Sequence, residues 1–289
     1  MSNQTKKVKK PLRKRIVIFL AHVVLAILAF IWLIPIFWVL LTSFRGTQGS
    51  YSSTFFPTVY SLKNYVKLFT DFSVFNFPQM LSNTVIIAVA NCLLSTFFVV
   101  SVAYTLSRLR FKSRKSLMNA AMIINLFPGF MSMIAIYHFM KLLGLDQSLA
   151  ALVMVYSGGA ALKYYVAKGF FDTIPKSLDE AACIDGATRN DIFFKIILPN
   201  SMPIVTYTAI EAFIAPWVDF IFVSVIMKDN YQNYTVALGL YKMLERENIY
   251  NYFTQFCAGA VLVALPITLL FIKIQKFYVG GVVGGAVKG

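Results

Sequence analysis

Residues 180–186 read Glu-Ala-Ala-Cys-Ile-Asp-Gly, and residues 196–199 read Ile-Ile-Leu-Pro. Both stretches belong to one polar segment that separates two long apolar runs. Its small residues allow another backbone to approach closely, its glycine accepts a turn, and its proline stops a helix. In a chain whose apolar runs cross a membrane, such a segment indicates a docking surface.

Apolar residues dominate the rest of the chain. Of 289 residues, 58% are hydrophobic and 13% are charged, and the mean hydropathy is +0.69. A soluble domain carries about 25% charged residues, so the bilayer must be the solvent for much of this chain. Lipid offers the backbone no hydrogen-bond partner, so every span must be helical. The prediction is an all-α polytopic membrane protein with six transmembrane helices, at residues 16–41, 81–106, 117–140, 149–170, 203–227 and 253–274.

Basic residues predict how these spans are oriented. Lysines and arginines gather in residues 1–15, between residues 108 and 115, and in the polar segment. Cytoplasmic loops carry such an excess, so both termini and the polar segment are expected in the cytoplasm. The net charge of +15 comes without a folded basic domain or a groove-reading motif, so nucleic acid is not an expected partner. The first run is too long for a signal-peptide core and is expected to stay as a span.

The segments outside the spans complete the predicted organisation. Residues 42–80 and 228–252 form extracytoplasmic loops rich in aromatic residues, and residues 278–289 form a cytoplasmic glycine-rich tail. The tail is either disordered or a partner contact. Spans two to six, residues 81–277, form the main body. The three cysteines and two histidines stand apart from one another, which favours packing over metal binding, so no metal site is expected.

Local signals shape the polar segment, residues 171–202, into two short helices. Ser177 and Glu180 have the spacing of a capping box, and Thr188 with Asp191 repeats a cap pattern. Gly186 favours a turn between the two helices, and Pro199 is expected to end the second.

The complete pattern, EAA, three residues, Gly, nine residues and then I-x-L-P, resembles the loop by which MetI-like permeases of ABC importers engage their ATPase subunits. Other stretches resemble the carbohydrate branch of that family: residues 83–84, 103–108, 127–128, 144–145, 168–171, 264–266 and 285–289. Among its members, the chain is similar to the shorter permease subunit of maltose/maltodextrin importers. One departure is Trp217-Val218-Asp219-Phe220, where the family often has Asn as the second residue. The fold implied is a MetI-like, type I ABC importer permease core.

The resemblance implies a division of labour between subunits. The expected partners are a second permease subunit, two copies of an ABC ATPase, an extracytoplasmic sugar-binding protein that contacts residues 228–252, and membrane lipid. The chain lacks G-x-x-x-x-G-K-[ST], the loop that cradles nucleotide phosphates. ATP and Mg are therefore expected on the partner ATPase, and this chain is expected to bind no cofactor and to hold no catalytic residue. The expected location is the plasma membrane of a prokaryote.

By the same resemblance, the first short helix is a coupling helix that sits in a groove of the ATPase. The residues expected at this contact are Glu180, Ala181, Ala182, Asp185, Gly186, Ala187, Ile196, Leu198 and Pro199. Lys288 in the tail is a further expected contact with the ATPase.

Polar residues inside the spans mark a candidate translocation path. Charges in lipid are costly and usually face a cavity or a partner, which singles out Glu211, Trp217 and Asp219 in the fifth span. Lys163 lies at a similar depth and either pairs with Glu211 or extends alone to the interface. Pro216 is expected to kink the fifth span and to free a carbonyl toward a cavity.

The predicted function is therefore a permease subunit that converts ATPase closure into alternating access for oligosaccharides. Malto-oligosaccharides lead, while galacto-oligosaccharides, other glycans and glycerol phosphate remain open. Members of the family that carry amino acids, phosphate or polyamines are a further alternative. An ion-coupled secondary transporter is the rival from another class, and it needs acids at mid-membrane that bind a proton or sodium ion.

Overall fold

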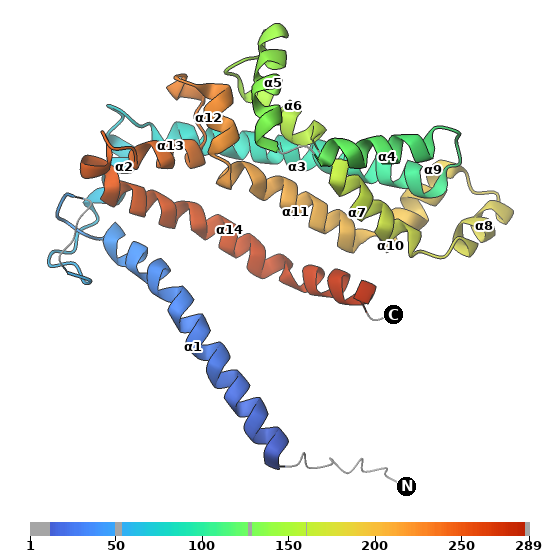
Figure 1. Ribbon diagram of the computed structural model, residues 1–289, viewed down its shortest axis with the longest axis horizontal. Helices are drawn as coiled ribbons and strands as arrows, with labels where there is room; N and C mark the ends of the chain where they lie inside the picture. Colours follow the sequence, from blue (N-terminus) through green and yellow to red (C-terminus); the bar gives the residue numbers. More distant parts are fainter. Residues whose placement is uncertain (1–11, 50–53, 127–128, 160, 287–289) are drawn as a thin grey trace.

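A computed structural model describes residues 12–49, 54–126, 129–159 and 161–286 (Figure 1). In these ranges every regular element is helical, and the one β-type contact is an isolated bridge between Arg45 and Tyr60. The all-α prediction is confirmed.

Three helices are each long and apolar enough to cross a membrane: α1 (Leu12–Ser43), α3 (Phe77–Arg108) and α14 (Ile249–Ala286). Three bent pairs meet the same criterion when each pair is taken together: α4 (Arg114–Asn125) with α5 (Gly129–Leu142), α6 (Leu149–Gly158) with α7 (Ala161–Asp172), and α11 (Met202–Val218) with α12 (Ile221–Met227). Counting each pair as one span gives the six predicted spans in the described part of the chain.

The third and fourth spans differ from the continuous helices that the sequence predicted, whereas the fifth is bent close to Pro216, where a kink was expected. The bends measure 103° between α4 and α5, 41° between α6 and α7, and 64° between α11 and α12. In the fourth span the bend lies at Gly158 and Gly159, where glycine weakens the helix. In the fifth span it follows Pro216, which removes a helical hydrogen bond.

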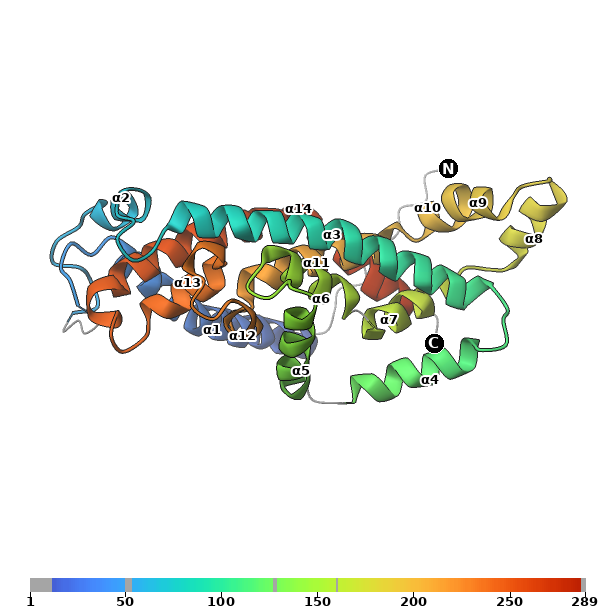
Figure 2. The same ribbon diagram turned by 90° about the horizontal axis from the view of Figure 1, so that it is seen from above.

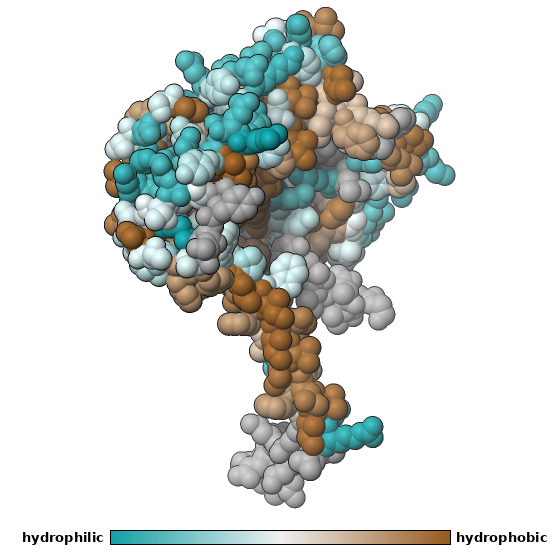
Figure 3. Space-filling model, turned by 60° about the vertical axis from the view of Figure 1, so that its left-hand side comes forward, coloured by the Kyte–Doolittle hydropathy of each residue, from teal (hydrophilic) through white to brown (hydrophobic). Residues whose placement is uncertain are grey.

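The long helices are arranged around α3. Helix α3 runs the length of the molecule and packs against α6, α7 and α11, whereas α1 contacts α14 near Ser43 and diverges from it toward the N-terminus (Figures 1 and 2). Figure 3 shows α1 as an apolar column that stands away from the body. No residue in the most apolar stretch of α1 is buried inside the chain. Such a surface is stable in lipid, which fits a membrane span.

The two predicted extracytoplasmic loops fold back onto the helices at one end of the molecule. Residues 42–80 contain α2 (Lys63–Thr70), and residues 228–252 contain a 3₁₀ turn, η2 (Tyr231–Asn233), and α13 (Val236–Met243). The Asn83 amide donates to the carbonyls of Gln232 and Tyr234, and the Val236 N–H donates to the Thr84 hydroxyl. These bonds tie the second of the two segments to α3.

The opposite end of the molecule carries the polar segment (Figures 1 and 2). It contains four short elements: α8 (Ser177–Ile184), α9 (Arg189–Asp191), the π-helix η1 (Ile192–Ile197) and α10 (Leu198–Asn200). We call residues 177–200 the bracket. The glycine-rich segment, expected as a tail after the last span, continues α14 as helix as far as Ala286.

Candidate functional site

The first helix of the bracket begins without the predicted capping box. Ser177 is the first helical residue of α8, and Lys176 occupies the cap position without a side-chain hydrogen bond. The predicted box fails because a cap residue must precede the first turn, and the helix starts one residue too early for Ser177 to fill that place. Asp179 and Glu180 do lie in the first turn, where the helix dipole favours negative charge.

The turn after α8 forms as the sequence predicted. Gly186 has a φ of 82°, in the left-handed region that glycine accepts. Its N–H donates to Cys183 O at 3.1 Å, and the Ala187 N–H donates to Ala182 O at 2.9 Å. This pair of bonds is a Schellman motif, which satisfies the last carbonyls of α8. The space where a Gly186 side chain would project is open: apart from the two chain neighbours, no atom of the described residues lies within 4 Å of a Cβ there.

The second half of the bracket starts with a confirmed cap. Thr188 and Asp191 form a reciprocal capping box ahead of η1. Hydrogen bonds from Lys195 and Thr188 lower the pKa of Asp191 to about 2, so the box keeps its charge throughout the physiological pH range. The prediction that Pro199 ends this helical run is wrong. The run continues to Asn200, because Pro199 occupies the first turn of α10, where its missing N–H costs nothing.

The residues predicted to dock on an ATPase do not all face outward. Glu180, Ala181, Asp185, Gly186 and Pro199 are exposed, and Ala187, Ile196 and Leu198 are half-buried. Ala182 is buried against the chain itself, so the structure gives it a packing role in place of an exposed contact.

Three further apolar side chains of the bracket are exposed. They are Leu178, Ile184 and Phe194, and Ile184 is 87% exposed at the end of α8. Ile184 could have been found from its position next to the predicted turn at Gly186. An apolar side chain at such a turn has few neighbours within its own chain.

The bracket is fastened to the end of α3. Arg108, the last residue of α3, is 5% exposed and forms an ion pair with Asp179 at 2.9 Å. The Arg108 guanidinium also donates to Ile174 O at 2.9 Å. The rings of Tyr104 and Phe193 pack with centroids 4.7 Å apart, which adds a second contact from α3. These contacts connect α8 and η1 to the central helix.

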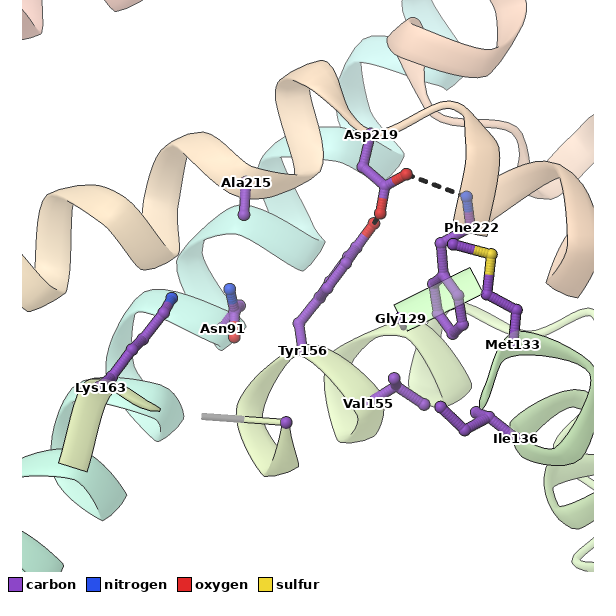
Figure 4. Close-up of a pocket in the computed structure, with 11 residues that line it drawn as sticks. Asn91, Gly129, Met133, Ile136, Val155, Tyr156, Lys163, Ala215, Asp219 and Phe222 are labelled. Carbon is purple, nitrogen blue, oxygen red and sulfur yellow. Dashed lines mark hydrogen bonds between the residues drawn. The ribbon is translucent and has the colours of Figure 1, made fainter. Parts of the chain in front are cut away.

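A pocket of about 310 Å³ lies within the membrane-spanning body, between α3, α5, α6, α7, α11 and α12 (Figure 4). The residues that line it are Asn91, Gly129, Met133, Ile136, Val155, Tyr156, Gly159, Lys163, Ala215, Asp219 and Phe222. Gly129, Gly159 and Asp219 each adjoin the break in one of the three bent spans. The pocket is therefore lined by a residue next to the bend of each of these spans.

Asp219 is the predicted path residue that lines the pocket. Its carboxylate accepts the Tyr156 hydroxyl at 3.0 Å and the Phe222 N–H at 2.9 Å (Figure 4). The second bond caps the start of α12 after the break. Trp217, predicted for the same path, is 5% exposed and is not among the lining residues of this pocket.

The sequence predicts that Pro216 frees a carbonyl toward a cavity, but in the structure this carbonyl has a hydrogen-bond donor. Proline cannot donate to the carbonyl four residues earlier, which is that of Ala212. The Asn91 amide on α3 donates to this oxygen at 2.6 Å. Sequence reasoning missed Asn91, although a lone amide in an apolar span signals a polar partner inside the membrane.

Lys163 and Glu211 form the ion pair that their matching depth suggested, with 3.4 Å between Nζ and Oε1. Glu211 does not itself line the pocket. The two side chains are 25% and 43% exposed within the chain, so solvent or a partner reaches them and the pair is expected to contribute at most about 1 kcal/mol.

A charge-swap test addresses whether this pair holds the fourth and fifth spans together during transport. Lys163→Glu and Glu211→Lys are each expected to reduce uptake, because each places two like charges next to one another where the ion pair stood. The double variant restores the attraction and is expected to recover most of the uptake, measured with purified complexes in vesicles. A double variant no better than either single one would show that the pair has no such role.

The remaining predictions concern contacts and cofactors. Lys288 and most of the basic N-terminus lie outside the described residues. Within the described ranges, no group of three or more His, Cys, Asp or Glu side chains is placed to hold a metal ion. The absence of a bound cofactor stays a prediction.

Comparison with known proteins places these features in context. Residues 95–279 match the family described as "Binding-protein-dependent transport system inner membrane component". The chain is 33% identical over 278 residues to the galactooligosaccharides transport system permease protein GanQ of Bacillus subtilis (strain 168), covering 96% of this chain and 98% of that protein. It is 34% identical over 286 residues to the maltose/maltodextrin transport system permease protein MalG of Vibrio vulnificus (strain YJ016), covering 92% and 94%.

Among solved structures, the fold is similar to a chain from a bacterial ABC transporter involved in the import of the acidic polysaccharide alginate. The TM-score is 0.79 at 22% sequence identity, and the match covers 94% of this chain and 99% of the other. At this level of identity the likeness shows the fold.

Proposed function

Because this chain belongs to the family of binding-protein-dependent transport system inner membrane components, we propose that its bracket receives work from a partner ATPase and passes it to the spans of an oligosaccharide importer. The chain is a MetI-like permease subunit of a sugar ABC importer in a prokaryotic plasma membrane, and it is not an enzyme. ATP hydrolysis is the task of a separate ATPase.

The observation that carries the proposal is the ion pair between the buried Arg108 side chain and the half-buried Asp179. It joins a largely exposed short helix, α8, to the helix at the centre of the fold. A docking surface that only held two subunits together would need no such connection. A surface that must move the spans needs one, since force applied at α8 has to reach α3.

The exposed face of α8 supports the docking role. It presents the Glu180 carboxylate, the small Ala181 and the apolar Ile184 around the open turn at Gly186. Interfaces of moderate size combine an apolar centre with a charged rim in this way. The proposed occupant is the groove of the partner ATPase, one of two copies in a complex that also contains a second permease and an extracytoplasmic binding protein.

The proposed substrates are malto-oligosaccharides first and galacto-oligosaccharides second. The relatives named for maltose/maltodextrin and for galactooligosaccharides match the chain over nearly its full length, at 34% and 33% identity. Direct measurement of ligand binding by the cognate binding protein, with maltotriose and galactotriose as probes, decides between the two.

Energy coupling is tested with the complete complex in vesicles. We expect maltotriose or galactotriose uptake to require ATP, the binding protein and the ATPase, and to stop when the ATPase is omitted. An ion-coupled secondary transporter would behave in the opposite way, with uptake that survives loss of the ATPase and follows an imposed proton or sodium gradient.

A further inference from the structure

The short helix α2 turns its apolar side chains outward. Leu62, directly before the helix, and Val66 and Phe69 within it are all exposed. Residues three and four apart in a helix share one face, so these three side chains form a stripe. We call this stripe, Leu62, Val66 and Phe69, the outer stripe of α2. A contiguous exposed apolar face marks a contact with a protein or with a membrane.

The opposite face of α2 fixes this orientation. Asn64 is buried there, and its amide donates to Ser43 O at 2.9 Å and to Arg45 O at 2.8 Å. The Asn64 side-chain oxygen accepts the hydroxyl of Thr254 on α14 at 3.0 Å. A rotation of α2 that covered the outer stripe would remove the partners of this buried amide, which is costly. The outward position of the stripe is therefore a consequence of the fold.

The same hydrogen bonds place α2 at the height where the first span leaves the membrane. Ser43, which accepts the Asn64 amide, is the last residue of α1, and the apolar run of that span ends at Leu41. Helix α2 also packs against α14 and α3, at the end of the molecule opposite the bracket (Figure 1). The outer stripe therefore lies close to a membrane–water boundary.

The segment that precedes α2 exposes aromatic side chains at the same height. Phe55, Phe56 and Tyr60 are exposed. The N–H of Ser61 donates to Phe44 O at 2.7 Å, one residue beyond the end of α1, which holds this segment next to the span. Amphipathic aromatic side chains such as that of Tyr60 are enriched at membrane–water boundaries.

Two lysines favour a membrane over a protein as the occupant of this face. Lys63 and Lys67 lie on successive turns at one border of the outer stripe, and within the described ranges neither forms an ion pair. Lysine is depleted from protein–protein interfaces. It is typical of helices that lie in a membrane surface, where the stem packs along apolar groups and the ammonium reaches the headgroups.

We propose that α2 is an interfacial membrane helix. The outer stripe inserts into lipid on the side of the membrane opposite the bracket, and Lys63 and Lys67 contact lipid phosphate groups. The lipid-facing surface of α1 ends at this place, so α2 extends that surface beyond the spans. This role goes beyond transport and does not depend on which sugar the complex carries.

A fluorescent label on the outer stripe measures the proposed depth. Val66→Cys is labelled with bimane in the complete complex, after the three native cysteines have been replaced by alanine. The vesicles contain phosphatidylcholine and phosphatidylglycerol in equal amounts, with bromine either near the headgroup end or near the tail end of the acyl chains. We expect stronger quenching by the shallow bromine, at a depth of about 5–10 Å below the headgroup boundary.

Two labelled positions calibrate the measurement. Leu28 lies near the middle of the first span and is exposed to lipid, so a label at Leu28→Cys is expected to be quenched most by the deep bromine. Arg246 is an exposed polar residue in the other loop at this end of the molecule, so a label at Arg246→Cys is expected to be quenched little by either bromine.

The lysines are tested with Lys63→Gln and Lys67→Gln combined. Removing both charges is expected to reduce quenching of the label at residue 66 in vesicles that contain phosphatidylglycerol, and to have a smaller effect in phosphatidylcholine alone, because attraction to anionic lipid contributes to interfacial binding. Equal quenching with and without the lysines in both kinds of vesicle would overturn the proposed headgroup contact.

A photoreactive residue identifies the occupant without any change to the native cysteines. Benzoylphenylalanine in place of Phe69 is expected to form cross-links to lipid when the complete complex is illuminated in the same vesicles. Cross-links mainly to the second permease or to the binding protein would overturn the proposal and assign the face to that protein. Absence of quenching at residue 66 by the shallow bromine, in a complex that assembles, would also overturn it.

Discussion

A complex that carries Gly186→Leu is expected to insert and assemble but to lose ATP-driven sugar uptake by a factor of about 30 or more, the effect of disrupting one central interface contact worth about 2 kcal/mol. The structure supplies two reasons. Gly186 has a φ of 82°, which strains any branched side chain, and the space beside its Cα is open on the outer side of the bracket. The Cβ of a leucine there meets no neighbouring atom within 4 Å, so its side chain starts into open space on the side of the proposed ATPase groove.

Two control substitutions separate backbone strain from loss of docking. Gly186→Ala carries the left-handed strain, roughly 1 kcal/mol, with almost no added bulk. Gly186→Asn adds a medium-sized side chain that tolerates this conformation. Retained uptake in the Ala variant with loss in the Leu variant assigns the effect to docking. The readouts are uptake, ATPase activity stimulated by the binding protein, and thermal stability of the solubilised complex. A Leu variant that assembles and transports normally would refute the assignment.

The spans could be predicted from the sequence because crossing the bilayer imposes a length threshold of about 20 apolar residues. The bends within the third and fourth spans could not be predicted, and in the fifth span only a kink near Pro216 was expected. Apolar composition is similar on both sides of each break, and hydropathy alone does not register a bend. Pro216 signalled a kink, but the actual break lies at Asp219, where the side chain caps a new helix.

In the bracket, the sequence predicted correctly those features that depend on only a few consecutive residues. The turn at Gly186 and the cap at Thr188 each require only a few consecutive residues, and both form as predicted. The cap at Ser177 failed because the start of α8 is set one residue earlier than the motif requires. A capping motif shows which side-chain hydrogen bonds can form, but the packing of the surrounding fold decides at which residue the helix begins.

Contacts between distant residues account for what was missed in the membrane. Lys163 and Glu211 were paired by depth alone, and the structure brings them together. Tyr156 and Asn91 gave weaker signals, since a tyrosine in an apolar run also fits the interfacial belt and a single asparagine has no evident partner in sequence. Their partners, Asp219 and the Ala212 carbonyl, are reached only after the helices pack.

The role that the sequence predicts for Arg108 differs from the role that the structure indicates. Its position at the end of the second span places it among the cationic residues that orient the chain. In the structure it is 5% exposed and paired with Asp179. Arg108→Leu is therefore expected to reduce uptake about tenfold or more. Removing one partner of a fully buried ion pair costs about 3 kcal/mol. Because the Asp179 side chain is 20% exposed, we take about half of that value, and each 1.4 kcal/mol shifts an equilibrium tenfold.

The control for orientation is Arg110→Leu, an exposed cation two residues further along the same cluster. If charge at the span end were all that mattered, both variants would lower the amount of inserted protein alike. If the ion pair matters, Arg108→Leu alone reduces uptake per assembled complex. Membrane content is measured by quantitative immunoblot, and uptake and ATPase activity are measured with the same vesicles.

A double variant separates stability from transmission of force. Arg108→Leu with Asp179→Leu leaves no unpaired charge, and replacing a buried ion pair by apolar residues is often neutral for stability. Thermal stability is therefore expected to recover. Uptake is expected to stay low, because the apolar pair lacks the directional contact that makes α3 follow α8, and ATP hydrolysis then proceeds with little transport. Recovery of both properties would show that the pair only stabilises the bracket, and that α8 moves the spans through the packing of Tyr104 and Phe193.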